Sequence, residues 1–137
     1  MLHLDSSALI SSGRHRACYV HPHDKNLVVK VLLPSVTGSP ATETRREIKY
    51  YRRLIKKNTP FTLLPRFHGE VMTNHGPGYL YDLIRDFNGD ISRNLEYYLT
   101  NNSCWDESEC RLFATAWDTL RDYLFKWKIM TMQIQAR

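Results

Sequence analysis

The sequence predicts an α+β fold: a five-stranded antiparallel sheet with one helix packed across it, followed by further helices. Residues 27–33 read LVVKVLL between an Asp-Lys-Asn turn and Pro34, and such a valine-rich run is typical of a strand covered on at least one face. Residues 42–57 have the spacing of an amphipathic helix. Turn residues divide the remaining apolar segments into two hairpins, which gives the order strand, strand, strand, helix, strand, strand.

The first predicted hairpin covers residues 4–19 and turns at Ser11-Ser12-Gly13. Glycine at position 13 allows a positive φ or a close backbone approach. Arg14, His15 and Arg16 follow directly, so the turn is both open and positively charged. A simple solvated hairpin tip explains the same residues, and the turn alone does not decide between them.

Lys30 is the one charged residue of the 27–33 strand. Burying it is unfavourable unless it meets an anionic partner. Glu47 is the interior acid of the 42–57 helix, and it lies at the edge of an apolar stripe, from which it can reach inward. The stripe consists of Ile48, Tyr51, Leu54 and Ile55. Alternatively, the spacing of Thr44 and Glu47 fits a capping box at the start of this helix.

The composition indicates a folded protein without a membrane span. The chain has 137 residues, of which 42% are hydrophobic and 24% charged, and no segment approaches the roughly 18 apolar residues of a span. No signal peptide is visible at the amino terminus, and the three cysteines lack metal-ligand spacing, which favours a cytoplasmic protein. Four residues could be imagined as zinc ligands, but their irregular spacing argues against a metal site. They are His15, Cys18, His21 and His23.

The formal net charge is +5, and much of it lies in the 42–57 helix. Its cations are Arg45, Arg46, Lys49, Arg52, Arg53, Lys56 and Lys57. A solvated helix face explains them, and the alternative is a binding module that uses the basic helix Arg45–Lys57 to contact a protein or, less favoured, a nucleic acid.

The second half begins with a helix end at Asn58-Thr59-Pro60 and a hairpin in which residues 70–73 pair with 79–84 across a 74–78 turn. A polar, glycine-bearing linker covers residues 85–90. Helices are predicted at 95–99 and 107–127, the second started by Asp106 with Glu109. The stripe of the second helix consists of Phe113, Ala116, Trp117, Leu120, Leu124 and Trp127.

With these elements in order, the chain resembles the small lobe and first large-lobe helices of the protein-kinase fold. More closely, it resembles the YrbL family of PhoP-regulatory-network proteins, which are bacterial and kinase-like. The closer match is carried by GRHR at 13–16 with CY at 18–19, REIKYY at 46–51, PRFHG at 65–69, GYLYD at 78–82 and MTM at 130–132. The resemblance covers nearly the whole chain.

The resemblance implies the domain boundaries and the site. Residues 1–84 would be the small lobe, 85–102 the hinge with a short helix, and 103–137 the start of the large lobe. ATP with Mg²⁺ is the implied cofactor, held by Lys30 at the phosphates, with Glu47 holding that lysine. Of the three loop glycines of kinases only Gly13 is present, since Ser11 and Arg16 replace the others. The implied nucleotide-binding set is Gly13, Arg14, Arg16, Lys30, Glu47 and Asp86, the last in the hinge.

The resemblance also implies an incomplete catalytic apparatus. The position of the kinase catalytic aspartate falls on Gln133, and no acidic residue follows Asp122. Both metal-ligand positions would lie beyond residue 137, so we expect a truncated member or fragment that is inactive as a phosphotransferase, a pseudokinase in effect. Its expected partners are the missing large lobe or a regulatory protein. Without that lobe, the face of Phe113, Trp117, Leu120 and Leu124 should be exposed and should favour self-association.

Overall fold

The computed structural model describes residues 1–33, 39–101 and 106–130. The chain divides into two compact units, residues 1–89 and 90–137. The division falls inside the 85–102 segment. Each unit is described by itself below.

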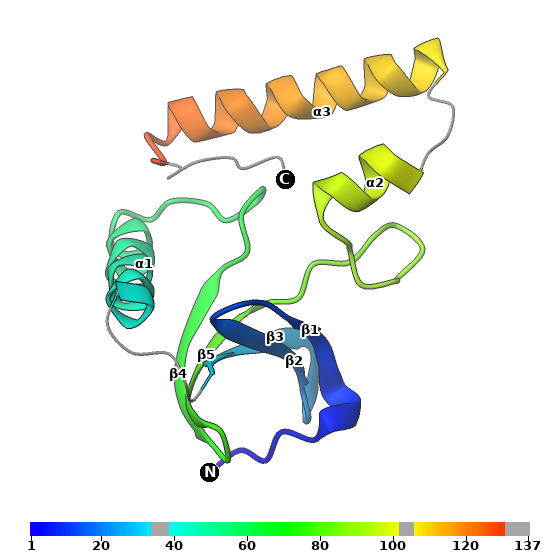
Figure 1. The fold of residues 1–137 in the computed structure, drawn as a ribbon. Helices are drawn as coiled ribbons and strands as arrows, with labels where there is room; N and C mark the ends of the chain where they lie inside the picture. The colour runs from blue at the N-terminus through cyan, green and yellow to red at the C-terminus, as the bar shows by residue number, and fades with distance from the viewer. Residues whose placement is uncertain (34–38, 102–105, 131–137) are drawn as a thin grey trace. The chain divides into compact units, whose positions relative to one another are not determined.

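The first unit contains a five-stranded sheet with the strand order β1-β2-β3-β5-β4, in which every neighbouring pair is antiparallel (Figure 1). The strands are β1 (Leu9–Ser12), β2 (Arg16–His21), β3 (Asp24–Leu32), β4 (Phe67–Thr73) and β5 (Gly76–Asp82), preceded by a 3-10 turn, η1 (Ser6–Ala8). This confirms the predicted five-stranded antiparallel sheet with one helix after the third strand. It also makes β3, the strand of Lys30, the central one.

The continuous apolar character of β3 follows from burial on both faces. Val29 and Val31 pack on one face with Ala17 of β2. Val28 packs on the opposite face, in a separate cluster. A central strand covered on both sides cannot show polar and apolar residues in strict alternation, which is why the sequence of this strand reads as a nearly unbroken apolar run.

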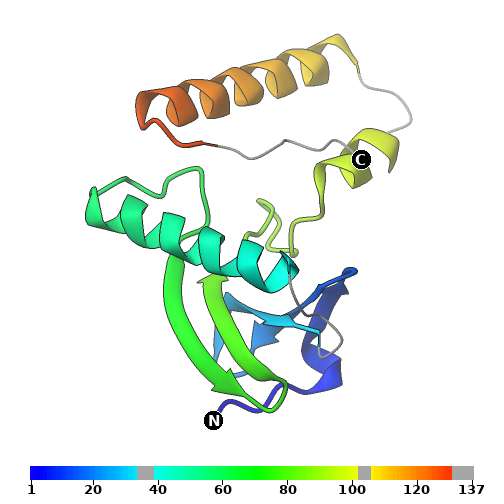
Figure 2. The same cartoon turned by 60° about the vertical axis from the view of Figure 1, so that its left-hand side comes forward.

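Helix α1 (Ser39–Lys56) lies across one face of the sheet (Figure 2). Ile48 belongs to the same buried cluster as Phe67 and Tyr81, and Tyr51 and Ile55 pack against that cluster. The predicted stripe therefore faces the sheet. The helix ends at Lys56. Asn58, two residues further on, has a left-handed φ of 54°, and the next amide, of Thr59, donates to the carbonyl of Leu54, as in a helix C-cap.

The start of α1 differs from the prediction. The helix begins at Ser39, three residues before Thr42. Pro40 is compatible with this start, because an N–H in the first turn of a helix has no acceptor within the helix and its absence costs nothing. Thr44 is consequently an interior residue with 2% exposure. The capping-box interpretation of Thr44 and Glu47 is therefore wrong, and Glu47 is free of any role at the helix start.

The amino-terminal segment covers the other face of the sheet. Leu4 is buried with Val29 and Val31, and Leu2 packs against the same cluster. Leu2 forms a parallel bridge with Thr73. The Asn74 side chain accepts a hydrogen bond from the Leu4 amide (2.8 Å) and donates one to the Leu4 carbonyl (3.1 Å). These contacts tie the first residues of the chain to the β4–β5 hairpin.

The β4–β5 hairpin turns more tightly than predicted, because only Asn74 and His75 lie between its strands. Gly76 begins β5 with a φ of 97°, a conformation that glycine adopts readily. Gly78, assigned to the turn by sequence, instead lies inside β5 opposite Val31 and Val71. Its lack of a side chain lets the strand approach the buried cluster closely.

The second unit contains α2 (Leu95–Asn101) and α3 (Glu107–Lys126). Both predicted helices are present, and the predicted cap at Asp106 is confirmed: its carboxylate accepts from the Glu109 amide at 2.8 Å, and the Glu109 carboxylate accepts from the Asp106 amide at 3.1 Å. Neither helix, nor any other in the described part of the chain, is long and apolar enough to cross a membrane.

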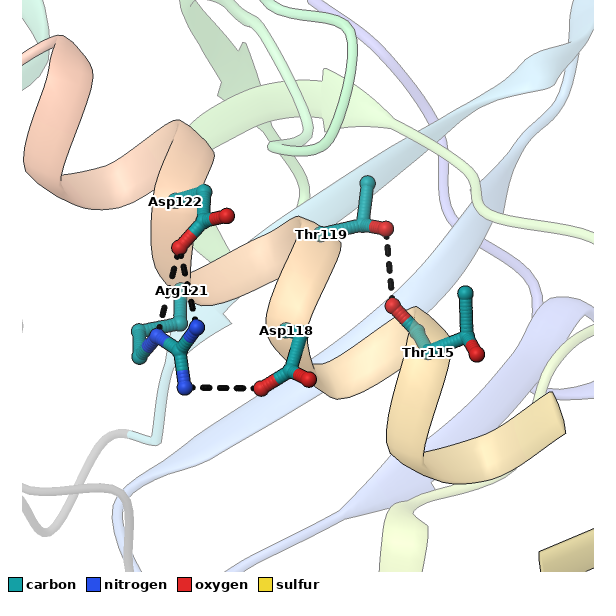
Figure 3. Close-up of polar contacts among 5 residues, drawn as sticks. All are labelled: Thr115, Asp118, Thr119, Arg121 and Asp122. Carbon is teal, nitrogen blue, oxygen red and sulfur yellow. Dashed lines mark hydrogen bonds and ion pairs between the residues drawn. The ribbon is translucent and has the colours of Figure 1, made fainter. Parts of the chain in front are cut away.

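One side of α3 is held by local polar contacts (Figure 3). Arg121 pairs with Asp118 at 2.7 Å and with Asp122 at 3.1 Å, and the Thr119 hydroxyl donates to the Thr115 carbonyl. These residues are exposed. Exposed pairs of this kind contribute modestly to helix stability, so this face is a solvated surface.

Candidate anion-binding site

Four side chains from four different elements meet on the face of the sheet that α1 covers. Arg16 comes from β2, Lys30 from β3, Tyr81 from β5 and Glu47 from α1. Glu47 lies at the centre of the group. Its Oε2 is 2.6 Å from Arg16 Nη1, and its Oε1 is 3.0 Å from the Tyr81 hydroxyl and 3.8 Å from Lys30 Nζ.

The strand register explains why these side chains converge. Lys30 pairs with Cys18 on one side and with Tyr79 on the other. Because side chains two residues apart share a face, Arg16 and Tyr81 lie on the same face as Lys30, each one diagonal step away. Helix α1 crosses that face and brings Glu47 over them. The structure thus places Lys30 and Glu47 on the same side of the domain, as the sequence predicted.

Tyr81 contributes a neutral donor and an aromatic surface. Burial, reinforced by the negative charge of Glu47, raises the pKa of Tyr81 far above its ordinary value, so the hydroxyl keeps its proton and donates a hydrogen bond to the Glu47 carboxylate. The Lys30 ammonium lies 4.2 Å from the centre of the Tyr81 ring, which is within the range of a cation–π contact. Tyr81 therefore contacts both members of the ion pair.

Glu47 is ionised despite its partial burial. Burial alone would raise the pKa of this carboxyl, but the positive charge of Lys30, the hydrogen bond and charge of Arg16 and the Tyr81 hydroxyl outweigh it, and the pKa is lowered from its ordinary value of 4.5. Two cations then face one carboxylate, which leaves one positive charge in excess. The side chains of Arg16, Lys30 and Glu47 are 28–29% exposed, so a dissolved anion can reach them.

The structure brings together three of the six predicted nucleotide-binding residues: Arg16, Lys30 and Glu47. Gly13 and Arg14 lie in the exposed turn just before Arg16, and the Gly13 amide donates to the Arg16 carbonyl at 2.8 Å. The φ of Gly13 is outside the left-handed region, so this glycine does not use the positive φ that it would allow. The space beside Gly13 is open, since an added Cβ would meet only the Arg16 carbonyl, at 3.8 Å.

Asp86 lies in the loop after β5 and is half-buried, with its carbonyl accepting from the Gly89 amide at 2.9 Å. Arg85 holds this loop to the sheet: its guanidinium donates to the carbonyls of Lys25 and Gly89. The loop therefore has a defined conformation at the end of the first unit. Gln133, which the resemblance placed at the catalytic-base position, lies outside the described residues.

Tyr81 is the member of the site that sequence reasoning missed. The pattern Tyr79–Tyr81 shows that both rings share one face of β5. That signal could have indicated a tyrosine beside Lys30, but only if the pairing of β5 with β3 had been known. The expected order of strands along the chain does not state which strands become neighbours, so the contact was not predictable.

Comparison with known proteins gives the family. Residues 2–137 match the family model described as "PhoP regulatory network protein YrbL", and the chain belongs to this family, as the resemblance predicted. It is 34% identical over 137 residues to proteins named "Uncharacterized protein YrbL" from Escherichia coli (strain K12) and from Shigella flexneri. Each match covers 100% of this chain and 64% of the relative. The chain therefore spans under two thirds of the length of these relatives. No solved structure matches.

Proposed function

We propose that the first unit binds the phosphate groups of a nucleotide, ATP above all, as the small lobe of a kinase-like regulatory protein in a PhoP-type network. The observation that carries this proposal is the 3.8 Å approach of Lys30, on the central strand, to Glu47, on the helix packed across it. This strand-lysine and helix-glutamate arrangement is the one that positions nucleotide phosphates in protein kinases.

The charges support the proposal. A lysine ammonium is a compact point charge with three donors, which suits a phosphate oxygen, and the excess positive charge beside Glu47 favours an anion. Arg14, in the open turn next to Arg16, adds a second cation within the same segment. By the same resemblance, the loop that contains Asp86 would lie near the adenine.

The described residues do not supply a magnesium site. In the ranges 1–33, 39–101 and 106–130, no three acidic, histidine or cysteine side chains come together as metal ligands. We therefore assign no residue within those ranges to Mg²⁺. The proposal is one of nucleotide binding without phosphotransfer, in keeping with the glutamine at position 133, because a carboxamide has no useful basicity near neutral pH.

Titration calorimetry with ATP tests the proposal on the 137-residue chain. Lys30→Met should weaken ATP binding by about tenfold or more, as expected when a charged contact to phosphate is lost. Lys25→Met is the matched control, because Lys25 is an exposed lysine on the same strand. Its affinity should stay within about twofold of the unaltered chain. Equal ATP affinity for the Lys30→Met variant and the unaltered chain would contradict the proposal.

A second candidate function rests on the outer face of α1. All seven cations between Arg45 and Lys57 are exposed, and within the described part of the chain only Arg52 has an ion pair, with Glu70 at 2.5 Å. Such a face fits an acidic surface on a protein partner. Fluorescence anisotropy with labelled poly-glutamate and with a duplex DNA probe tests it. Lys49→Glu with Arg53→Glu should weaken poly-glutamate binding, and selective binding of the DNA would contradict the choice of partner.

A further inference from the structure

We infer that Arg16 is a positioning residue: its guanidinium binds the Glu47 carboxylate and thereby keeps the Lys30 ammonium available to an external phosphate anion. The identity of that anion rests on the proposed function, but the effect of Arg16 on Lys30 does not. The inference differs from the simple kinase resemblance, in which the helix glutamate holds the strand lysine.

The first step is how the carboxylate of Glu47 is used. Arg16 Nη1 contacts Oε2 at 2.6 Å, and the Tyr81 hydroxyl donates to Oε1 at 3.0 Å. Both oxygens therefore have a strong partner. Lys30 Nζ remains 3.8 Å from Oε1, which is too long for a hydrogen bond and leaves only an electrostatic attraction.

The second step is why Arg16 is the stronger partner. A guanidinium–carboxylate contact is a charge-assisted hydrogen bond, and arginine is more weakly hydrated than lysine, so it is better suited to a half-buried pair. The backbone also fixes Arg16 in place. The Gly13 amide donates to the Arg16 carbonyl, and the Leu33 amide donates to the neighbouring His15 carbonyl at 3.0 Å. These bonds hold the start of β2 against the end of β3.

The third step is the state of Lys30. Within the residues that the structure describes, its ammonium has the 3.8 Å attraction to Glu47 and the contact with the Tyr81 ring, but no hydrogen bond. Its side chain is 29% exposed. Among the described residues, no protein acceptor therefore takes up an N–H donor of Lys30, which leaves the ammonium available to an anion. Without Arg16, Oε2 would lose its partner, and Lys30 could take Glu47 as a direct hydrogen-bond partner.

Acylation of Lys30 by a water-soluble N-hydroxysuccinimide ester, followed by peptide mapping, tests the inference in the absence of nucleotide. Arg16→Met should slow acylation of Lys30 by about fivefold, because an ammonium that is hydrogen-bonded to the Glu47 carboxylate is less available to the reagent. Arg16→Lys, which retains the charge, should restore most of the rate. Lys25→Met removes a charge elsewhere on β3 and should leave the Lys30 rate within about twofold.

The same variants in a Glu47→Gln background show whether Arg16 acts through Glu47. The effect of Arg16→Met should disappear there, whereas an equal slowing in both backgrounds, or no slowing in either, would overturn the inference. Circular dichroism confirms that each variant is folded, and Arg16→Lys provides the folded comparison if Arg16→Met unfolds.

A separate arm distinguishes this inference from the proposed function. ATP added to the unaltered chain should protect Lys30 from acylation if nucleotide binds there. Absence of protection, together with an Arg16 effect that depends on Glu47, would reject the nucleotide proposal while supporting the role of Arg16. Protection of Lys30 by ATP without an effect of Arg16→Met would support the nucleotide proposal and reject the role of Arg16.

Discussion

At the scale of single residues, the lowered pKa of Glu47 links the stability of the first unit to pH. The folded state favours the ionised carboxylate, so its contribution to stability is complete above the ordinary value of 4.5 and is lost as pH falls through the lowered folded-state pKa. Unfolding by urea at several pH values should show the unaltered chain more stable than Glu47→Gln at pH 7, with the difference shrinking as the pH falls below about 4.5.

Glu70→Gln is the control for that series. Glu70 pairs with Arg52 on the surface, and an exposed pair contributes little, so its effect should be small throughout. A Glu47 effect that stays constant down to pH 3 would contradict the assigned role of its charge.

The two cations of the site should differ in their contribution to folding. Lys30→Met should change the free energy of unfolding by less than about 1 kcal/mol, because Glu47 keeps Arg16 and the methionine sulfur can still contact the Tyr81 ring. Arg16→Met removes the 2.6 Å hydrogen bond to Glu47. It should lower the free energy of unfolding by about 1 kcal/mol more than Lys30→Met does. Denaturant unfolding measures both values, and the opposite order would show that Lys30 is the main partner of Glu47.

The sequence predicted Lys30 and Glu47 as a pair because each stands out in its element: one charge in an apolar strand, one interior acid in a basic helix. It could not predict that Arg16 and Tyr81 take the carboxylate oxygens. Those contacts depend on which strands become neighbours and on the register between them, which alternation alone does not determine.

At the scale of elements, the close approach at Gly78 makes β5 sensitive to a single methyl group. A Cβ at this position would lie 2.8 Å from Val29 Cγ1 and 2.9 Å from Thr73 Cγ2. Since Val29 is fully buried, it has little room to move, and Gly78→Ala should destabilise the unit by about 1–3 kcal/mol. Gly13→Ala is the control for stability. An added Cβ at position 13 would lie in the open space described above, so Gly13→Ala should change the free energy of unfolding by less than about 0.5 kcal/mol. Thermal unfolding compares the two, and equal stabilities would contradict the packing at Gly78.

The elements themselves were largely predictable, but their ends were not. Periodicity identified α1, and the acid pair at 106 and 109 identified the start of α3. The first turn of α1 was missed because Gly38, Ser39 and Pro40 resemble a loop, although proline is acceptable at a helix start. The role of Gly78 was missed because a glycine close to a turn looks the same in sequence whether it bends the chain or makes room for a neighbour.

At the scale of the whole molecule, the two units should differ in self-sufficiency. Both buried clusters of the sheet are formed by residues within the first unit, so residues 1–89 expressed alone should unfold in one cooperative transition. Circular dichroism during urea unfolding checks this. A gradual, non-cooperative loss of signal would show that the second unit is required for folding.

The second unit presents apolar side chains on α3. Trp117 is 39% exposed, and Leu112 and Phe125 are more exposed still, whereas Phe113, Leu120 and Leu124 of the predicted face are half-buried. We expect the 137-residue chain to self-associate as its concentration rises. Sedimentation velocity should show this, with Trp117→Glu shifting the distribution toward monomer and Ser108→Glu, at an exposed polar position of the same helix, leaving it unchanged. A monomer at all concentrations would contradict the expectation.

The contact of Asn74 with Leu4 also has a kinetic consequence. It joins residues 70 positions apart, whereas the β1–β2–β3 meander and the β4–β5 hairpin can each form from neighbouring segments. Because contacts of long sequence separation form late in folding, the amino-terminal segment is expected to dock after the β1–β2–β3 meander and the β4–β5 hairpin have associated. Interactions that form after the transition state slow unfolding without accelerating folding. The first four residues would thus determine how long the folded sheet persists, while the rate at which it assembles is determined elsewhere.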